Sequence, residues 1–282
     1  MIALLLAASS ALLWGTGDFC GGKATQRAAA LPVTLISQLV GVPVLVMCVL
    51  LTTTTAPRPA DLFWGAVAGA AGFIGIVLLY RGLAAGSMAI FAPVTAVTAA
   101  VVPLGVGLLL DKPPSAFELA GVGCAVVAIG LMSVTSSGGG DRSGRVSRRL
   151  LVLALAAGTL FGVFFAVLGK AGGPDSGLWP LVGVRAGSIG LGLVLVLGTR
   201  TSLRLGRPVL RLAAVAGSFD IVANALYLLA AQRGLLSIVA PIAALYPAST
   251  VLLALAVDRE RIRPIQAAGL GLAATALVLV AT

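Results

Sequence analysis

Long apolar stretches fill the chain from end to end, and short polar segments separate them. A helix crosses a bilayer with about 20 predominantly apolar residues, roughly 30 Å at 1.5 Å per residue. Charged residues and Pro/Gly breaks divide this chain into runs of about that length. The pattern predicts an all-α integral membrane protein with ten transmembrane helices, at residues 2–21, 31–51, 62–80, 88–110, 115–134, 150–169, 178–198, 208–232, 236–257 and 264–281.

The second half of the chain repeats the pattern of the first. A shift of 148 positions places residues 66–131 on 214–279 without a gap, and 18 of these 66 positions are identical. A unit with an odd number of spans inverts its second copy, and two inverted copies are a recurrent transporter design. We therefore expect two inverted five-helix repeats, at 1–134 and 150–282, joined by a Gly/Ser/Arg linker at 135–149.

Glycine occurs 36 times, and several glycines stand four residues apart inside the apolar runs. Small residues at this spacing let helices approach closely in lipid, where apolar burial does not drive association. Helix packing is the interpretation that we adopt for Gly65/Gly69, Gly158/Gly162 and Gly183/Gly187.

Composition and charge agree with a membrane protein. Hydrophobic residues make up 59% of the chain and charged residues 10%, whereas soluble domains carry about 25% charged residues. The net charge of +10 does not indicate nucleic acid, because Lys and Arg gather in the short loops. The loops after odd-numbered spans hold 14 of them when Arg211 at the start of the eighth run is included, and those after even-numbered spans hold 4. The positive-inside rule then places both termini outside the cytoplasm, in a multi-pass cytoplasmic-membrane protein. The first run lacks a basic leader and is interpreted as a retained helix.

The strongest cluster of polar side chains lies in the eighth run. Asp220, Asn224 and Tyr227 are spaced by four and three residues, which places them on one helix face near the bilayer midplane. Charges at that depth are costly and usually mark a cavity or a pathway. We interpret the cluster as a candidate substrate or coupling site. The alternative is a purely structural pair between Asp220 and a buried arginine.

The repeat comparison adds further candidates, because the two copies share small residues and differ at polar ones. Tyr246 falls on Thr98 at the shift of 148, and Arg185 falls on Gln38 at a shift of 147. Arg185 is able either to hold a substrate carboxylate or to neutralise Asp220, and the sequence leaves both roles open. An arginine and a carboxylate together would fit a zwitterion such as an amino acid.

Asp18, which together with Trp14 completes the set of candidate substrate-binding or coupling residues, lies near the end of the first run. It is either a proton-coupling carboxylate or an interfacial group reached by water, and its nearness to the predicted end of the span favours the second. Prolines are expected to bend two other spans and to free backbone carbonyls beside a cavity: Pro93 and Pro103 in the fourth, Pro241 and Pro247 in the ninth.

Other kinds of chemistry lack their motifs. The chain has no P-loop lysine motif, no Ser-His-Asp set and no histidine, so we expect no enzyme, no cofactor and no metal. Cys20, Cys48 and Cys124 have no ligand-like spacing and are interpreted as packing residues. Aromatic residues, at 5% of the chain, look too sparse for a cation cage.

Taken together, these residues resemble the EamA-type, ten-helix members of the drug/metabolite transporter superfamily. The resemblance covers the whole chain and implies a secondary transporter of small organic solutes, driven by protons or by exchange. It implies a cavity lined by spans one, three, four, six, eight and nine, and termini in the cytoplasm, contrary to the charge count. An acid–base pair often closes span four in this family; Asp111-Lys112 and Glu260-Arg261 are its counterparts here. The resemblance rests on Trp14-Gly15, Asp18–Gly22, Tyr80–Ala84, Ala92–Val94, Ala223–Tyr227, Leu236–Pro241, Leu245–Ala248 and Asp258–Arg261.

Three functions are compatible with the sequence. The first is an exporter of metabolites, amino acids or drugs that works by alternating access. The second is an importer or exchanger of the same superfamily. The third, which the duplication disfavours, is a membrane-embedded enzyme or a structural membrane subunit. The expected partners are a small-molecule substrate, the lipid bilayer and protons, with the chain as a monomer or homodimer.

Overall fold

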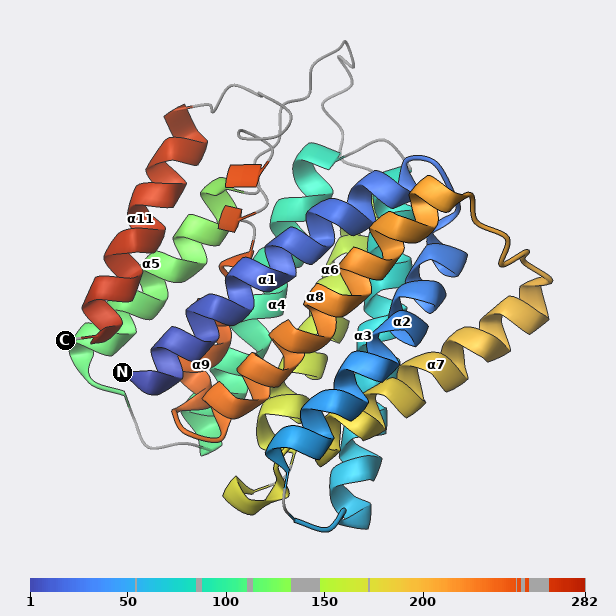
Figure 1. Cartoon of the computed structure of the whole chain (residues 1–282). Helices are drawn as coiled ribbons and strands as arrows, with labels where there is room; N and C mark the ends of the chain where they lie inside the picture. The colour runs from blue at the N-terminus through green and yellow to red at the C-terminus, as the bar shows by residue number, and fades with distance from the viewer. Residues whose placement is uncertain are drawn as a thin grey trace.

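The apolar runs of the sequence form α-helices in the computed structural model of the protein (Figure 1). The structure describes residues 1–281, except for 54, 85–87, 111–113, 133–147, 172, 247, 250–251 and 254–263. A short 3-10 helix at Pro174–Ser176 precedes α7. The helices are α1 (Ile2–Thr25), α2 (Ala30–Thr52), α3 (Pro59–Ala84), α4 (Met88–Leu110), α5 (Ala116–Met132), α6 (Arg148–Lys170), α7 (Trp179–Thr199), α8 (Arg207–Ala231), α9 (Leu236–Ala243) and α11 (Pro264–Ala281).

Six helices in the described part of the chain are long and apolar enough to cross a membrane, namely α1, α2, α3, α6, α7 and α8. Shorter apolar helices occur at Val94–Leu110, Ala116–Leu131 and Ala267–Ala276. An all-helical, multi-pass membrane protein is therefore what the structure supports, and ten spans stay a prediction. The predicted linker at 135–149 and the acid–base pairs near 111 and 260 lie largely outside the described residues.

The ninth predicted span is broken. The sequence predicted one span at 236–257, bent by its prolines; in the structure α9 ends at Ala243 and a turn follows at residues 244–245. Pro241 inside α9 has no backbone N–H to donate, and Pro247 in the sequence is four residues after Ala243, whose carbonyl it is unable to bond. Pro247 itself lies outside the described residues. Helical turns resume at Tyr246, so this side chain sits just beyond the break.

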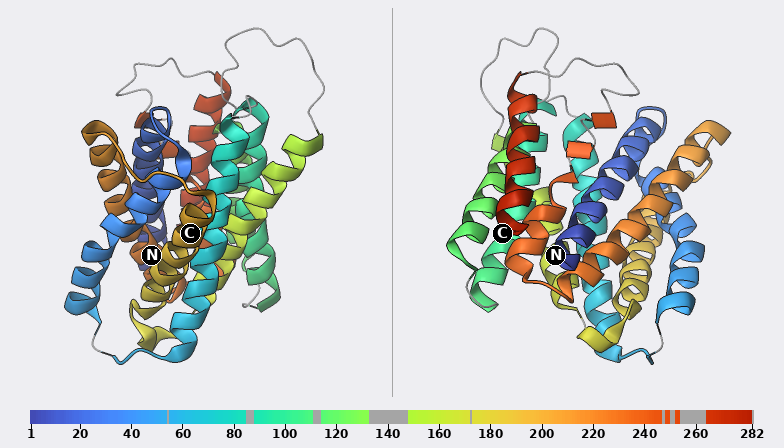
Figure 2. Two further views of the ribbon diagram at one scale, coloured as in Figure 1. Left: turned by 90° about the vertical axis from the view of Figure 1, so that its right-hand side faces the viewer. Right: turned by 60° about the vertical axis from the view of Figure 1, so that its left-hand side comes forward.

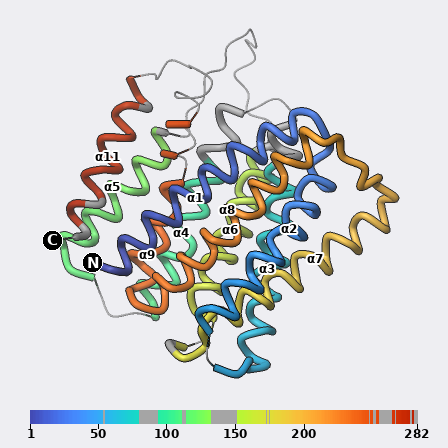
Figure 3. The backbone as a smooth tube through the Cα atoms, viewed as in Figure 1, coloured from blue at the N-terminus to red at the C-terminus, as the bar shows by residue number. Residues whose placement is uncertain are grey.

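Helix pairing is the same when the two halves are exchanged. α1 packs on α8 and α6 packs on α3, which is the corresponding pair in the other half. Likewise α2 packs on α8 and α7 on α3, while α4 packs on α6 and α9 on α1. The last helix of each half, α5 and α11, pair with each other at one edge of the bundle (Figure 3). Equivalent helices thus occupy equivalent places, as an internal repeat requires.

Glycines make the closest of these contacts. On α3, an added Cβ at Gly65 or Gly69 would collide with the backbone of Pro180 or Val184 in α7. Facing them, Gly187 of α7 lies against the carbonyl of Ala66. The four-residue glycine spacing in these helices therefore lets two backbones touch, as expected for close helix contacts in lipid.

The two ends of the bundle are distinct. The start of α1 and the end of α11 lie near one another on one side of the molecule (Figures 1 and 2). The connections from α1 to α2 and from α7 to α8 lie on the opposite side (Figure 1). These two connections carry part of the basic excess counted in the sequence, so we refer to this side as the basic side.

Candidate functional site

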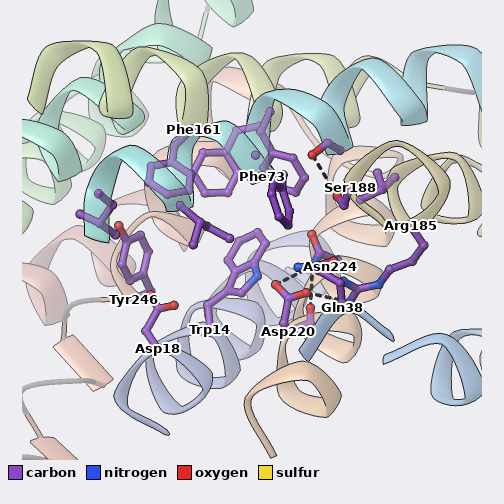
Figure 4. Close-up of a pocket in the computed structure, with 17 residues that line it drawn as sticks. Trp14, Asp18, Gln38, Phe73, Phe161, Arg185, Ser188, Asp220, Asn224 and Tyr246 are labelled. Carbon is purple, nitrogen blue, oxygen red and sulfur yellow. Dashed lines mark hydrogen bonds and ion pairs between the residues drawn. The ribbon is translucent and has the colours of Figure 1, made fainter. Parts of the chain in front are cut away.

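A cavity of about 90 Å³ lies between helices from both halves of the chain (Figure 4). One water occupies about 10–15 Å³ on a comparable measure, so the cavity has room for several waters or for part of a small solute. It brings together seven of the eight side chains singled out in the sequence, whose role in binding stays a prediction. These are Trp14, Asp18, Gln38, Arg185, Asp220, Asn224 and Tyr246.

The helices around this cavity differ from those that the family resemblance implies. α1, α3, α6 and α8 line it as expected, and Tyr246 represents the ninth span. However, α2 and α7 also line it, through Gln38 and through Val184, Arg185 and Ser188. No described residue of α4 does.

Arg185 and Asp220 form an ion pair at the polar side of the cavity. Nη2 of Arg185 donates to Oδ2 of Asp220 over 2.7 Å. The exposed fraction of the arginine side chain is 4%, and that of the aspartate is 29%. In this structure the guanidinium therefore neutralises Asp220, one of the two roles that the sequence left open. A charge as buried as Arg185 requires such a partner, because desolvation is otherwise uncompensated.

Asn224 completes this network from the next turn of α8. Its Nδ2 donates to the Asp220 carbonyl over 2.7 Å and to the Asp220 carboxylate Oδ1 over 3.0 Å. The four-residue spacing placed both side chains on one face, as the sequence indicated. The carboxylate consequently has a charged donor on one oxygen and a neutral donor on the other.

A glycine makes room for the ion pair. Arg185 extends from α7 past α2 to reach α8, and a Cβ on Gly41 would lie 2.9 Å from its Nη2. The same Cβ would lie 3.0 Å from the carbonyl oxygen of Gly217 on α8. Any larger residue at position 41 would have to displace the guanidinium or separate two helices.

Three buried polar atoms of this region have no hydrogen-bond partner among the described residues. They are Oε1 of Gln38, Oδ1 of Asn224 and Nε of Arg185. Gln38 and Asn224 are 6% and 2% exposed, and both line the cavity. Buried acceptors without a partner are unfavourable by about 1–3 kcal/mol each. A bound solute or water with N–H or O–H donors would satisfy the two amide oxygens, whereas Nε of Arg185 requires an acceptor.

Aromatic rings form the opposite side of the cavity. Figure 4 shows Phe161 and Phe73 on the side of the cavity opposite Asn224, Gln38 and Asp220, with Trp14 between the two sides. Phe164 and Phe165 also line the cavity. The sequence analysis missed this surface because it weighed aromatic abundance over the whole chain. The spacing of residues 161, 164 and 165 on one face of α6 was a signal that it did not use.

Tyr227 lies outside the cavity, unlike its predicted neighbours. It is fully buried, and its hydroxyl donates to the carbonyl of Phe165 over 2.6 Å. Its ring packs 5.6 Å from that of Trp14, centroid to centroid. Tyr227 is seven residues from Asp220, about 10 Å along the helix axis. Its side chain therefore lies beyond the end of the cavity and contacts α6. The structure gives it a packing role.

Asp18 belongs to the cavity and not to a helix end. α1 continues to Thr25, beyond the predicted end at 21, and Asp18 is exposed to the cavity space. It interacts electrostatically with Asp220 and with Tyr246. Figure 4 shows it beside Tyr246, away from Arg185. The interfacial interpretation that the sequence favoured assumed a shorter helix.

A second, smaller cavity of about 50 Å³ adjoins the first. Both are lined by Trp14, Asp18, Gln38 and Asp220. The smaller one adds residues from the end of α1 and the start of α2, among them Gly21 and Val33. It therefore extends the space toward the basic side. At the other end, the Trp14, Phe165 and Tyr227 rings pack on one another and close it.

The groups that line this cavity are able to form hydrogen bonds, ion pairs and aromatic contacts. Within the described residues, no three His, Cys, Asp or Glu side chains are grouped to hold a metal ion. The cavity instead offers carboxylates, amides, one paired guanidinium and aromatic rings. Such a set binds and orients a small solute.

Comparisons with known proteins identify the family. A model described as the EamA-like transporter family matches residues 1–134 and residues 148–282. No curated protein matches the chain. Twenty-seven solved chains match it. One, titled only as the crystal structure of a protein, has a TM-score of 0.74 and 16% identity, covering 98% of this chain and 95% of its own; at that identity it shows a shared fold. The resemblance found in the sequence is confirmed, and the chain belongs to the EamA-like transporter family.

Proposed function

We propose that the protein is a secondary transporter that exports a small organic solute, such as a metabolite, an amino acid or a drug, across the cytoplasmic membrane. The observation that carries this proposal is a polar cavity between the two halves of an apolar helix bundle. Ionisable groups inside a membrane are unfavourable and are kept where a pathway needs them. Asp18, Arg185 and Asp220 meet in such a place.

Alternating access is the mechanism that the fold supports. The exchange-symmetric helix pairs favour ten spans arranged as two inverted five-helix repeats, with the seam at the 135–149 linker. Rocking of one half against the other would open the central cavity to each side in turn. In this structure the space extends toward the basic side, and the aromatic contacts of Trp14 close the other end.

Orientation gives this asymmetry a direction. If the loops with 14 Lys and Arg residues face the cytoplasm, the termini lie outside and the cavity faces inward. An inward-facing cavity is the state in which an exporter loads its solute. Asp18 and Asp220 are the carboxylates that would bind protons and solute in turn in a proton-coupled cycle.

Reconstitution tests the proposal. Purified protein in proteoliposomes should move a solute that it binds, and counterflow with and without a proton gradient separates exchange from proton coupling. Asp220→Asn should abolish flux while the protein still purifies as a folded monodisperse species. Glu118→Gln, which removes a carboxylate at the exposed start of α5, should leave flux unchanged. Wild-type protein that binds a solute and never moves it would contradict transport.

A further inference from the structure

The charges of the described cavity lining do not cancel. Arg185 and Asp220 neutralise each other across 2.7 Å, and Asp18 remains as one additional carboxylate. Asp18 forms no ion pair or hydrogen bond with another described residue. The two groups with which it interacts electrostatically, Asp220 and Tyr246, supply no positive charge. The described residues that line this cavity therefore carry one negative charge in excess.

Two of the three unpartnered polar atoms have the same preference, and the third, Nε of Arg185, belongs to the guanidinium that Asp220 already neutralises. Oε1 of Gln38 and Oδ1 of Asn224 are buried acceptors without a donor. The Nδ2 group of Asn224 already donates to Asp220, so the Oδ1 end of this amide faces away from Asp220. A ligand rich in N–H donors satisfies these acceptors, whereas a carboxylate would meet further oxygen atoms.

The other side of the cavity selects for the body of the ligand. Phe73 and Phe161 offer apolar surface opposite the acceptors, and Trp14 lies between the two sides (Figure 4). Phe164 and Phe165 add two further rings to the lining. Aromatic faces hold apolar or aromatic groups and also attract cations. The cavity is thus amphipathic, with acceptors on one side and rings on the other.

We propose that the solute recognised by this site is a protonated amine with an aromatic or similarly apolar body, and that Asp18 is its counter-ion. This inference rests on the proposed transport function. It replaces the zwitterion expected from the sequence, because the arginine that would hold a carboxylate is already paired with Asp220. An N–H-bearing ammonium fits better than a quaternary one, because its N–H groups can donate to Gln38 and Asn224 and the methyl groups of a quaternary ammonium cannot.

A series of phenyl compounds with different head groups tests the assignment. Binding to the full chain in detergent is measured by calorimetry for 2-phenylethylammonium, its N,N,N-trimethyl form, phenylalanine and 3-phenylpropionate. We expect the primary ammonium to bind about tenfold or more tightly than the propionate, and more tightly than the trimethyl form and phenylalanine. Equal or tighter binding of the propionate or of phenylalanine overturns the proposal, as does no binding of the primary ammonium at millimolar concentration.

Variants test the counter-ion. Asp18→Asn should weaken binding of the primary ammonium about tenfold, Asp18→Glu should retain most of it, and Glu118→Gln should match wild type. A change below twofold in Asp18→Asn overturns the role of Asp18. The binding series on the wild-type protein tests the solute class without any variant, so misfolding of a variant does not remove that test. Tight ammonium binding without flux in liposomes contradicts transport alone, whereas flux of phenylalanine without ammonium binding contradicts only the solute class.

Discussion

The Arg185–Asp220 ion pair should be worth measurable stability, and its two partners should respond unequally to mutation. Asp220→Asn leaves a guanidinium that is 4% exposed without a counter-ion. Arg185→Gln leaves a carboxylate that is 29% exposed and still accepts a hydrogen bond from Asn224. The orphaned charge is therefore more buried in the first variant than in the second.

The size of the effect follows from burial. Removing one partner of a fully buried pair destabilises a protein by about 3–5 kcal/mol. Asp220 is partly exposed, so we expect the low end of that range or less, about 2–3 kcal/mol for Asp220→Asn. For Arg185→Gln we expect about 1–2 kcal/mol, because cavity water and Asn224 solvate the remaining carboxylate. The double variant should lie below the sum of the two by about 1–2 kcal/mol.

Wild type, the two single variants and the double variant form a double-mutant cycle. Denaturant titration in mixed micelles, followed by circular dichroism, measures the free energy of unfolding of each of the four proteins. Each variant is first checked for a single monodisperse species, so that a folded population is compared with a folded population. Additive effects within about 0.5 kcal/mol would show that the pair contributes nothing beyond its members. A larger loss for Arg185→Gln than for Asp220→Asn would refute the argument from unequal burial.

Three further outcomes are expected. Gly187→Ala should destabilise the protein by about 1–3 kcal/mol, since its Cβ would collide with the carbonyl of Ala66, whereas Gly190→Ala on the same helix meets open space and should be neutral or mildly stabilising; melting of the two variants in parallel checks this. Tyr227→Phe should lose about 1 kcal/mol of stability and leave solute affinity unchanged in calorimetry, because its hydroxyl serves a backbone carbonyl outside the cavity. A reporter that fluoresces only in the cytoplasm, fused to the C-terminus, should stay dark; fluorescence would overturn the charge-count orientation.

Much of the helix pattern was available from the sequence. A helix in lipid satisfies all its backbone groups internally, so a run of about 20 apolar residues is sufficient to place it. The observed bounds of α2, α4 and α7 lie within two residues of the predicted runs. α9 departs from its run because Pro241 is only a local signal for a break whose position depends on the surrounding helices.

The sequence by itself determined that this chain is a duplicated, membrane-embedded helix protein and that Asp220 and Asn224 share a helix face, because hydropathy and helical periodicity are local properties of a chain. Only the tertiary structure decided which side chains meet across helices. It paired Arg185 with Asp220 past Gly41, gathered four phenylalanines around the same cavity, and assigned Tyr227 to packing. Contacts between residues far apart in the chain depend on how close two backbones come, and that distance is set by packing over the whole bundle.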